Sequence, residues 1–215
     1  MLPEISAIFD GLVKASVQHP EAASARAFLH GDQLTVGIRT AQSDTRRIVG
    51  KEGKNIDALK TVLNEMIKGF GLEGNIATHD TGPRPPPSGT RAFSLGAYDH
   101  EKFAGLKNLL ERTINPFVED FDSLEVSVDE IGTTAIFEIK VNALDLPKIY
   151  GTPILFDHGA SGIKKTDGHL IGALKRVFDG IGKNQGRVIK ITLTQSMSSE
   201  ATAVEHRAIQ FARST

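Results

Sequence analysis

The sequence predicts a mixed α/β (α+β) fold of two tandem units, each with the element order helix, strand, strand, helix, helix, strand. Apolar residues recur at helical spacing in some segments and alternate with polar residues in others, which gives that order. The proline-rich segment 83–89 divides the 215-residue chain near its middle, and the pattern before it returns after it. Each half is long enough to bury a core of its own.

The first half begins with an amphipathic helix that carries Ile5, Ile8, Phe9 and Leu12 on one side. Gly50 suits the left-handed residue that ends a helix. The expected elements are a helix over 5–17, strands over 23–29 and 34–40, a short helix that ends at Gly50, a helix over 56–70 and a strand over 73–78.

The second half repeats this order. Asp99 can cap a helix with apolar residues at helical spacing, and two alternating segments follow it. The expected elements are a helix over 103–114, strands over 124–128 and 134–141, a short helix that ends at Gly151, a helix over 171–178 and a strand over 188–193.

The two halves align residue by residue with one change of offset. An offset of 101 relates Val36, Ile38, Ile48 and Gly50 to Phe137, Ile139, Ile149 and Gly151. From Gly53, which corresponds to Gly168, the offset is 115. The change places a 14-residue insertion between the two glycines, so the second half is a diverged copy with a rebuilt turn. The predicted parts are a domain over 1–82, a proline-rich linker over 83–97, a diverged domain over 98–195 and a tail over 196–215, with a helix expected through 203–212.

The turn of the first half is the most informative segment. Gly50 and Gly53 enclose the polar pair Lys51-Glu52 between two helical patterns. Two residues without side chains let the backbone approach a sugar-phosphate chain, and the following helix points its unpaired N–H groups and positive dipole end at it. Lys51 and Lys54 add positive charge, whereas Glu52 repels phosphate and lowers the expected affinity. The turn predicts a phosphate-binding loop.

The segment Ile-Val-Gly-Lys-Glu-Gly-Lys-Asn-Ile, followed by Ala58-Leu59-Lys60, resembles the KH family of nucleic-acid-binding domains. The element order resembles the prokaryotic (type II) KH arrangement, which implies three strands backed by helices. The resemblance covers residues 4–80 well and 98–195 more weakly. It implies that the Gly-x-x-Gly loop holds about four nucleotides of single-stranded backbone.

The resemblance also implies a groove in which bases lie on aliphatic residues beside the loop. Ile38 and Ile48 are candidates for its floor, and core packing is the alternative for both. Arg46 and Arg47 are candidates for backbone contacts, and solvated arginines are the alternative. The RNA-binding residues expected from the motif are Arg46, Arg47, Ile48, Gly50, Lys51, Glu52, Gly53, Lys54 and Asn55.

Charge is uneven although the formal net charge is only -1. Segment 44–60 has five basic and three acidic residues, and segment 164–190 has seven and two. Segment 99–130 has nine acidic residues against three basic ones, which makes it a poor RNA surface. The N-terminal residues lack the apolar core of a signal peptide, and no segment predicts a membrane span, so we expect a cytoplasmic protein. The chain has no cysteine, which excludes disulfides.

Two other interpretations remain. Asp157-His158 and Asp167-Gly168-His169 would be the starting point for a metal enzyme, but their spacing matches no metal motif, so we expect no catalysis, metal or cofactor. The stronger alternative is a protein-interaction module, associated with the ribosome or regulatory, with weak or lost RNA binding. The second domain would support the first, form a homodimer or extend the surface. Sequence does not separate single-stranded RNA from single-stranded DNA as the partner.

Overall fold

The computed structural model describes residues 1–80, 100–119, 121–150 and 169–195. It confirms an α+β fold of two tandem units. The first unit contains α1 (Leu2–Ser16), β1 (Ser24–His30), β2 (Gln33–Thr40), α2 (Gln42–Val49), α3 (Lys54–Ile67) and β3 (Glu73–Asp80). The second contains α4 (His100–Ile114), β4 (Glu125–Ile131), β5 (Thr134–Val141), α5 (Leu146–Tyr150), α6 (His169–Asn184) and β6 (Val188–Gln195).

Each unit has one three-stranded sheet of the same topology. The orders are β1-β2-β3 and β4-β5-β6, with an antiparallel first pair and a parallel second pair. The registers are equivalent: Val36 of β2 lies opposite Ala27 and Ile76, and Phe137 of β5 lies opposite Val128 and Ile191. The bounds of β1 and β2 differ from those of β4 and β5 by 101, and those of β3 from those of β6 by 115. The two offsets of the sequence repeat are therefore confirmed by strand pairing.

Alternation along the central strands explains how each sheet binds its helices. In β2, Leu34, Val36 and Ile38 are buried, whereas Arg39 is exposed. In β5, alternate residues from Ala135 to Val141 are fully buried. One face of each sheet is thus apolar and packs on helices, because side chains in a strand alternate between the two faces.

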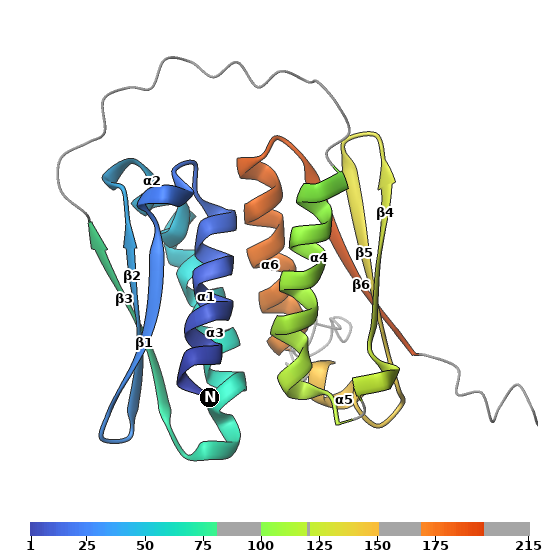
Figure 1. Ribbon diagram of the computed structural model, residues 1–215, viewed down its shortest axis with the longest axis horizontal. Helices are drawn as coiled ribbons and strands as arrows, with labels where there is room; N and C mark the ends of the chain where they lie inside the picture. Colours follow the sequence, from blue (N-terminus) through green and yellow to red (C-terminus); the bar gives the residue numbers. More distant parts are fainter. Residues whose placement is uncertain (81–99, 120, 151–168, 196–215) are drawn as a thin grey trace, which may run out of the picture.

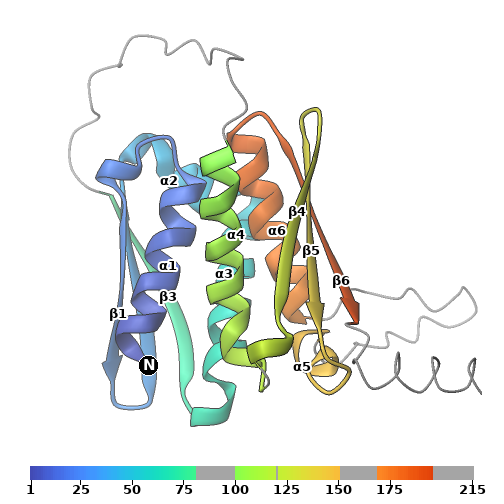
Figure 2. The ribbon, with the colours of Figure 1, turned by 45° about the vertical axis from the view of Figure 1, so that its right-hand side comes forward.

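The helices of the two units face each other between the two sheets, as Figures 1 and 2 show. Helix α3 packs on α6, and α1 packs on α4 and α6. Gly11 of α1 makes the close approach to α4 possible, because a Cβ there would lie 2.7 Å from Cδ1 of Leu109. Buried apolar residues of both units form one connected cluster. The helical surface that a lone unit would expose is thus buried within the chain.

A buried aspartate anchors the second helical segment of both units. Asp44 of α2 is fully buried and accepts hydrogen bonds from the backbone N–H groups of Gln18 and His19, at 3.2 and 3.0 Å. Asp145, just before α5, is also fully buried and accepts one from the N–H of Glu119 at 3.1 Å. The offset of 101 relates Asp44 to Asp145. The same carboxylate anchor is therefore present in both copies, with charge-assisted hydrogen bonds.

Several predictions fall outside the described residues. These are the linker 83–97, the insertion 152–167 with Asp157 and His158, the cap at Asp99, and the tail helix at 203–212.

Candidate nucleic-acid interface

The loop between α2 and α3 has a backbone that depends on its glycines. Gly50 has φ 76° and ψ 175°, and Gly53 has φ 77° and ψ 2°. The first of these lies in a region that only glycine adopts readily. A Cβ at Gly50 would also lie 2.6 Å from Cγ of Asn55. The loop closes through hydrogen bonds from the N–H of Gly50 to the carbonyl of Arg46, at 2.8 Å, and from Gly53 to Gly50, at 3.4 Å.

Glu52 occupies the left-handed region with φ 57°, and among the described residues no other non-glycine residue has a positive φ. Such a conformation costs about 1–2 kcal/mol for a residue with a side chain. Its carboxylate lies 2.7 Å from Nζ of Lys54, and both side chains are more than half exposed. The pair is an exposed ion pair, worth about 0–1 kcal/mol, and it offsets the charge of one lysine. Lys51 is exposed as well.

Helix α3 begins directly after Gly53. It runs for 14 residues, and no side-chain hydrogen bond caps it within the described residues. The first N–H groups of a helix lack carbonyl partners inside the helix and carry the positive end of its dipole. The N–H of Lys54 donates to the carbonyl of Lys51, and no side chain caps the N–H groups that follow. The loop therefore places two exposed lysines and a helix start without a side-chain cap at the same point.

The two arginines of α2 have different surroundings. Arg46 is exposed. Arg47 is held within the protein: its Nε lies 3.3 Å from Oδ1 of Asp44, and its Nη1 donates to Oδ1 of Asn184 at 2.6 Å. Its carbonyl accepts from Nδ2 of Asn55 at 2.9 Å. The guanidinium of Arg47 therefore links α2 to α6 of the second unit.

The structure places both candidate floor residues in the core. Ile38 and Ile48 are each 1% exposed. A base cannot lie on a side chain without accessible surface, so core packing, the alternative for both, is the observed state. Asn55 is partly buried, and its amide joins the loop to the end of α2.

The second unit covers the inner side of this loop. Gly180 of α6 lies so close that a Cβ there would be 3.3 Å from Nδ2 of Asn55. Asn184 of α6 donates to the carbonyl of Ser16 at 2.6 Å while it accepts from Arg47. The remaining cavity between these residues has a volume of about 10 Å³, which is room for one water molecule at most. Sequence gave no signal for this contact, because Arg47 and Asn184 are 137 positions apart.

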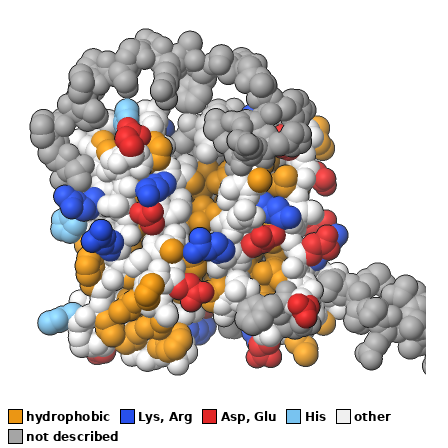
Figure 3. Space-filling view, in the orientation of Figure 1, with side chains coloured by type: hydrophobic (Ala, Val, Ile, Leu, Met, Phe, Trp, Pro, Cys, Tyr) orange, Lys and Arg blue, Asp and Glu red, His pale blue; other side chains and the backbone are white. Residues whose placement is uncertain are grey.

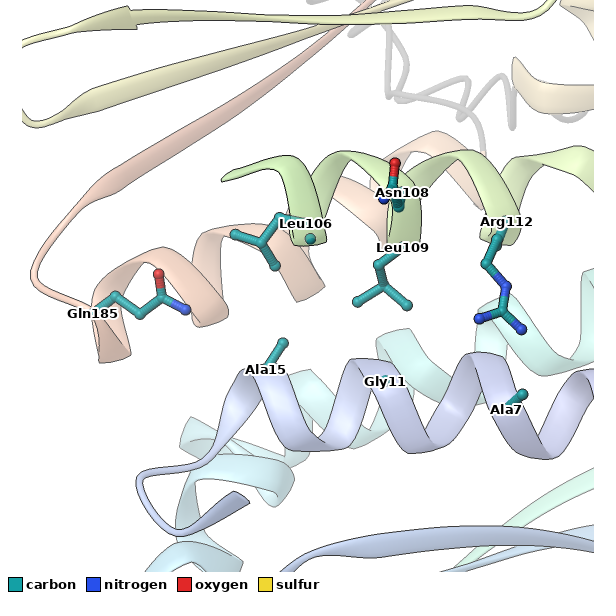
Figure 4. A pocket seen from close by; sticks show the side chains of 9 residues that line it. Ala7, Gly11, Ala15, Leu106, Asn108, Leu109, Arg112 and Gln185 are labelled. Carbon is teal, nitrogen blue, oxygen red and sulfur yellow. The ribbon is translucent and has the colours of Figure 1, made fainter. Parts of the chain in front are cut away.

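A larger groove of about 390 Å³ lies between α1 and α4 (Figure 4). Ala7, Gly11 and Ala15 form its α1 side, and Leu109 and Arg112 face them from α4. Arg112 is the only charged residue of the described lining, so the lining offers no acid–base pair. The groove is a helix–helix contact left partly open by small residues.

Charge differs between the two sides of the molecule in Figure 3. Lys, Arg and His side chains lie along the left-hand side, over the first sheet, and Asp and Glu side chains are prominent at the right-hand side. No cluster of three metal-ligating side chains occurs within the described residues. Each helix in the described ranges is too short or too polar to cross a membrane.

No protein-family model matches this chain, and no curated protein matches it.

Proposed function

We propose that the protein binds single-stranded RNA, with the phosphate backbone on the loop Gly50-Lys51-Glu52-Gly53 of a type II KH domain. The observation that carries the proposal is the loop itself: two glycines at positive φ, exposed lysines at positions 51 and 54, and the start of a 14-residue helix that no side chain caps. Backbone N–H groups at such a helix start, together with a helix dipole, favour a phosphate.

The strength of this site follows from its donors. Two or three charge-assisted hydrogen bonds at about 1.5–3 kcal/mol each give roughly 4–8 kcal/mol, which corresponds to a dissociation constant between about millimolar and micromolar. Lys51 supplies the less compensated charge, since Lys54 is paired with Glu52. The predicted binding is weak and sensitive to salt.

The second unit, a diverged KH-like copy, supports the loop in this proposal. Its helix α6 holds Arg47 and Ser16 through Asn184, next to the start of the loop. Its helical face is packed against the first unit and is not free for a second copy of the chain. Support of the loop is thus the role that its contacts favour over dimerisation.

Lys51, Glu52 and Lys54 are exposed, so the loop is open to a ligand and is not used to pack the two units. The two lysines beside a helix start are the feature that favours a phosphate backbone over a protein partner. The proposal is for a binding protein, not an enzyme, in which bound RNA remains unchanged.

Fluorescence anisotropy tests the proposal with labelled single-stranded RNAs at two salt concentrations. The Lys51→Asp, Lys54→Asp variant should bind at least tenfold more weakly than the parent and retain its thermal stability, because both side chains are exposed. The matched control is Lys60→Asp with Lys68→Asp, which makes the same charge change farther along α3 and at the residue after it, where both positions are exposed.

The control variant should keep most of the affinity. Equal losses in the two variants would mean that only overall charge matters, and that result contradicts the loop assignment. DNA of the same sequence, measured in parallel, separates the two kinds of nucleic acid through the 2′-hydroxyl.

A further inference from the structure

The outer face of the first sheet, opposite the helices, carries an exposed aromatic ring. Strand alternation turns Arg26, Phe28 and His30 of β1 outward, while Ala25 is buried on the inner side. Phe28 is 56% exposed. Polar residues are usual at outward strand positions, and a single exposed apolar side chain is common on protein surfaces, so the meaning of Phe28 depends on its neighbours.

Phe28 is supported from below by a glycine. Its ring reaches across to the central strand, where a Cβ on Gly37 would lie 3.2 Å from Cε2 of Phe28. In the sheet register Gly37 lies between Arg26 on β1 and Ala77 on β3. Gly37 and Ala77 therefore place no long side chain beside the Phe28 ring, and the ring with these two residues forms what we call the platform.

Two arginines lie on this face beside the platform. Arg26 stands next to Gly37, and the register places Arg39 beside His79 at the end of the sheet that leads into α2. Both arginines are exposed, and neither forms an ion pair with another described residue. Glu73 lies at the opposite end of the face. The face thus combines an exposed aromatic ring with two exposed guanidinium groups.

The same positions of the second sheet have the opposite character. The offset of 101 relates Phe28, Gly37 and Arg26 to Asp129, Glu138 and Ser127. Lys140 of that face lies near both Glu125 and Glu138, at 3.6 and 3.7 Å. Two sheets of identical topology therefore have different outer faces, one aromatic and cationic and the other acidic. The fold alone does not require the aromatic and cationic residues of the first sheet.

We propose that the outer face of the first sheet is a second contact surface for single-stranded nucleic acid, with a base stacked on Phe28 and the backbone phosphates bound by Arg26 and Arg39. Stacking on an aromatic ring accepts any base, and guanidinium groups pair with phosphate oxygens. The class of ligand rests on the proposed function, but the surface includes no residue of the loop. A strand longer than the four nucleotides of the loop is needed to reach both surfaces.

The test uses the absence of tryptophan from the chain. Phe28→Trp introduces a single reporter on the face, and Phe70→Trp introduces one at another exposed phenylalanine, 62% exposed, outside it. Both are placed in the Lys51→Asp, Lys54→Asp background and titrated with 12-nucleotide oligouridine RNA. We expect saturable, salt-sensitive quenching at position 28 and none at position 70.

Arginine variants and affinities complete the test. Arg26→Glu with Arg39→Glu should abolish the quenching, and Phe28→Ala should weaken 12-mer binding measured by anisotropy about 5- to 150-fold. Those anisotropy measurements stand even where the tryptophan variant does not fold. Absence of quenching together with unchanged 12-mer affinity in Phe28→Ala overturns the inference, as does a signal at position 28 that depends on protein concentration and not on RNA, which indicates a second copy on the face.

The outcomes separate the two proposals. Quenching at position 28 with equal binding by the parent and the loop variant leaves the sheet face standing and removes the loop. The opposite result is loss of RNA binding in the loop variant, no quenching of the tryptophan at position 28 and unchanged RNA affinity in Phe28→Ala. That result supports the loop and removes the sheet face.

Discussion

The two units have equivalent strands, registers and a buried aspartate, but they differ in the turn between their last two helices. In the first unit two residues separate the glycines between the helices, and in the second sixteen do, from Thr152 to Asp167. The sheets on either side of the change keep equivalent pairings. The comparison indicates that this turn lies outside what the fold requires, so its short glycine form in the first unit is available for a function.

The cation beside the buried aspartate also differs. Arg47 beside Asp44 extends to Asn184 of the other unit, whereas Lys148 beside Asp145 also binds Glu119 of its own unit, at 2.7 Å. Hydrogen bonds to Glu119 and then Asp145 raise the pKa of Lys148 above its ordinary value. Within the described residues, therefore, Arg47 connects the two units and Lys148 does not.

The largest expected effect comes from removing the shared anchor. Asp44→Ala leaves two backbone N–H groups and Arg47 without their carboxylate, and should lower the free energy of unfolding by about 3–5 kcal/mol. Asp145→Ala should cost a similar amount, measured by urea denaturation. A loss under about 1 kcal/mol in one variant would break the equivalence of the two anchors.

Gly50→Ala tests the loop glycine. Its φ and ψ fit only glycine and its Cβ meets Asn55, so we expect a loss of about 1–3 kcal/mol in stability together with weaker RNA binding. Gly69→Ala is the control, since a Cβ there has open space and the residue's φ is not positive. Equal effects of the two substitutions on the free energy of unfolding, measured by urea denaturation, would contradict the claim that position 50 requires glycine.

Asn184→Ala tests whether the second unit supports the first. The substitution removes the hydrogen bonds to Arg47 and Ser16, which should lower stability by about 1–3 kcal/mol and weaken RNA binding even though Asn184 does not touch the loop. Lys183→Ala, next to it, removes only an exposed ion pair with Asp179 and should change stability by less than about 1 kcal/mol. Unchanged RNA affinity in Asn184→Ala would contradict the claim that the second unit supports RNA binding by the loop.

Substitution of Glu52 should have the smallest effect, and it should raise RNA affinity where the other substitutions lower it. Glu52→Gly and Glu52→Asn both remove the negative charge and release Lys54, and should raise RNA affinity about two- to fivefold at low salt, in line with an exposed pair worth up to about 1 kcal/mol. Anisotropy at two salt concentrations measures this gain, which should shrink at high salt. Weaker binding in both variants would assign the carboxylate a direct role with the ligand.

Local pattern was sufficient for the elements and their order. The strands over 134–141 and 34–40 were predicted to within one residue, because alternation and turns fix a strand locally. The repeat offsets of 101 and 115 were predicted from apolar residues and glycines, and the strand bounds of the structure have the same offsets. The glycines at 50 and 53 predicted a tight turn, and both have a positive φ in the structure.

Long-range contacts were not predictable in this way. Nothing in segment 44–60 indicates that Arg47 binds Asn184, since that contact depends on how the two units pack. Periodicity gave Ile48 as apolar but did not distinguish a groove from the core. The outer face of the first sheet was missed, although Arg26-x-Phe28 in an alternating strand was the signal.

Amide chemical shifts test the central claim most directly. In ¹⁵N-labelled protein titrated with a four-nucleotide RNA, the account predicts the largest shift changes at the N–H groups of residues 50–55, with a Kd between about millimolar and micromolar. Shift changes concentrated elsewhere, or none at millimolar RNA, would contradict it.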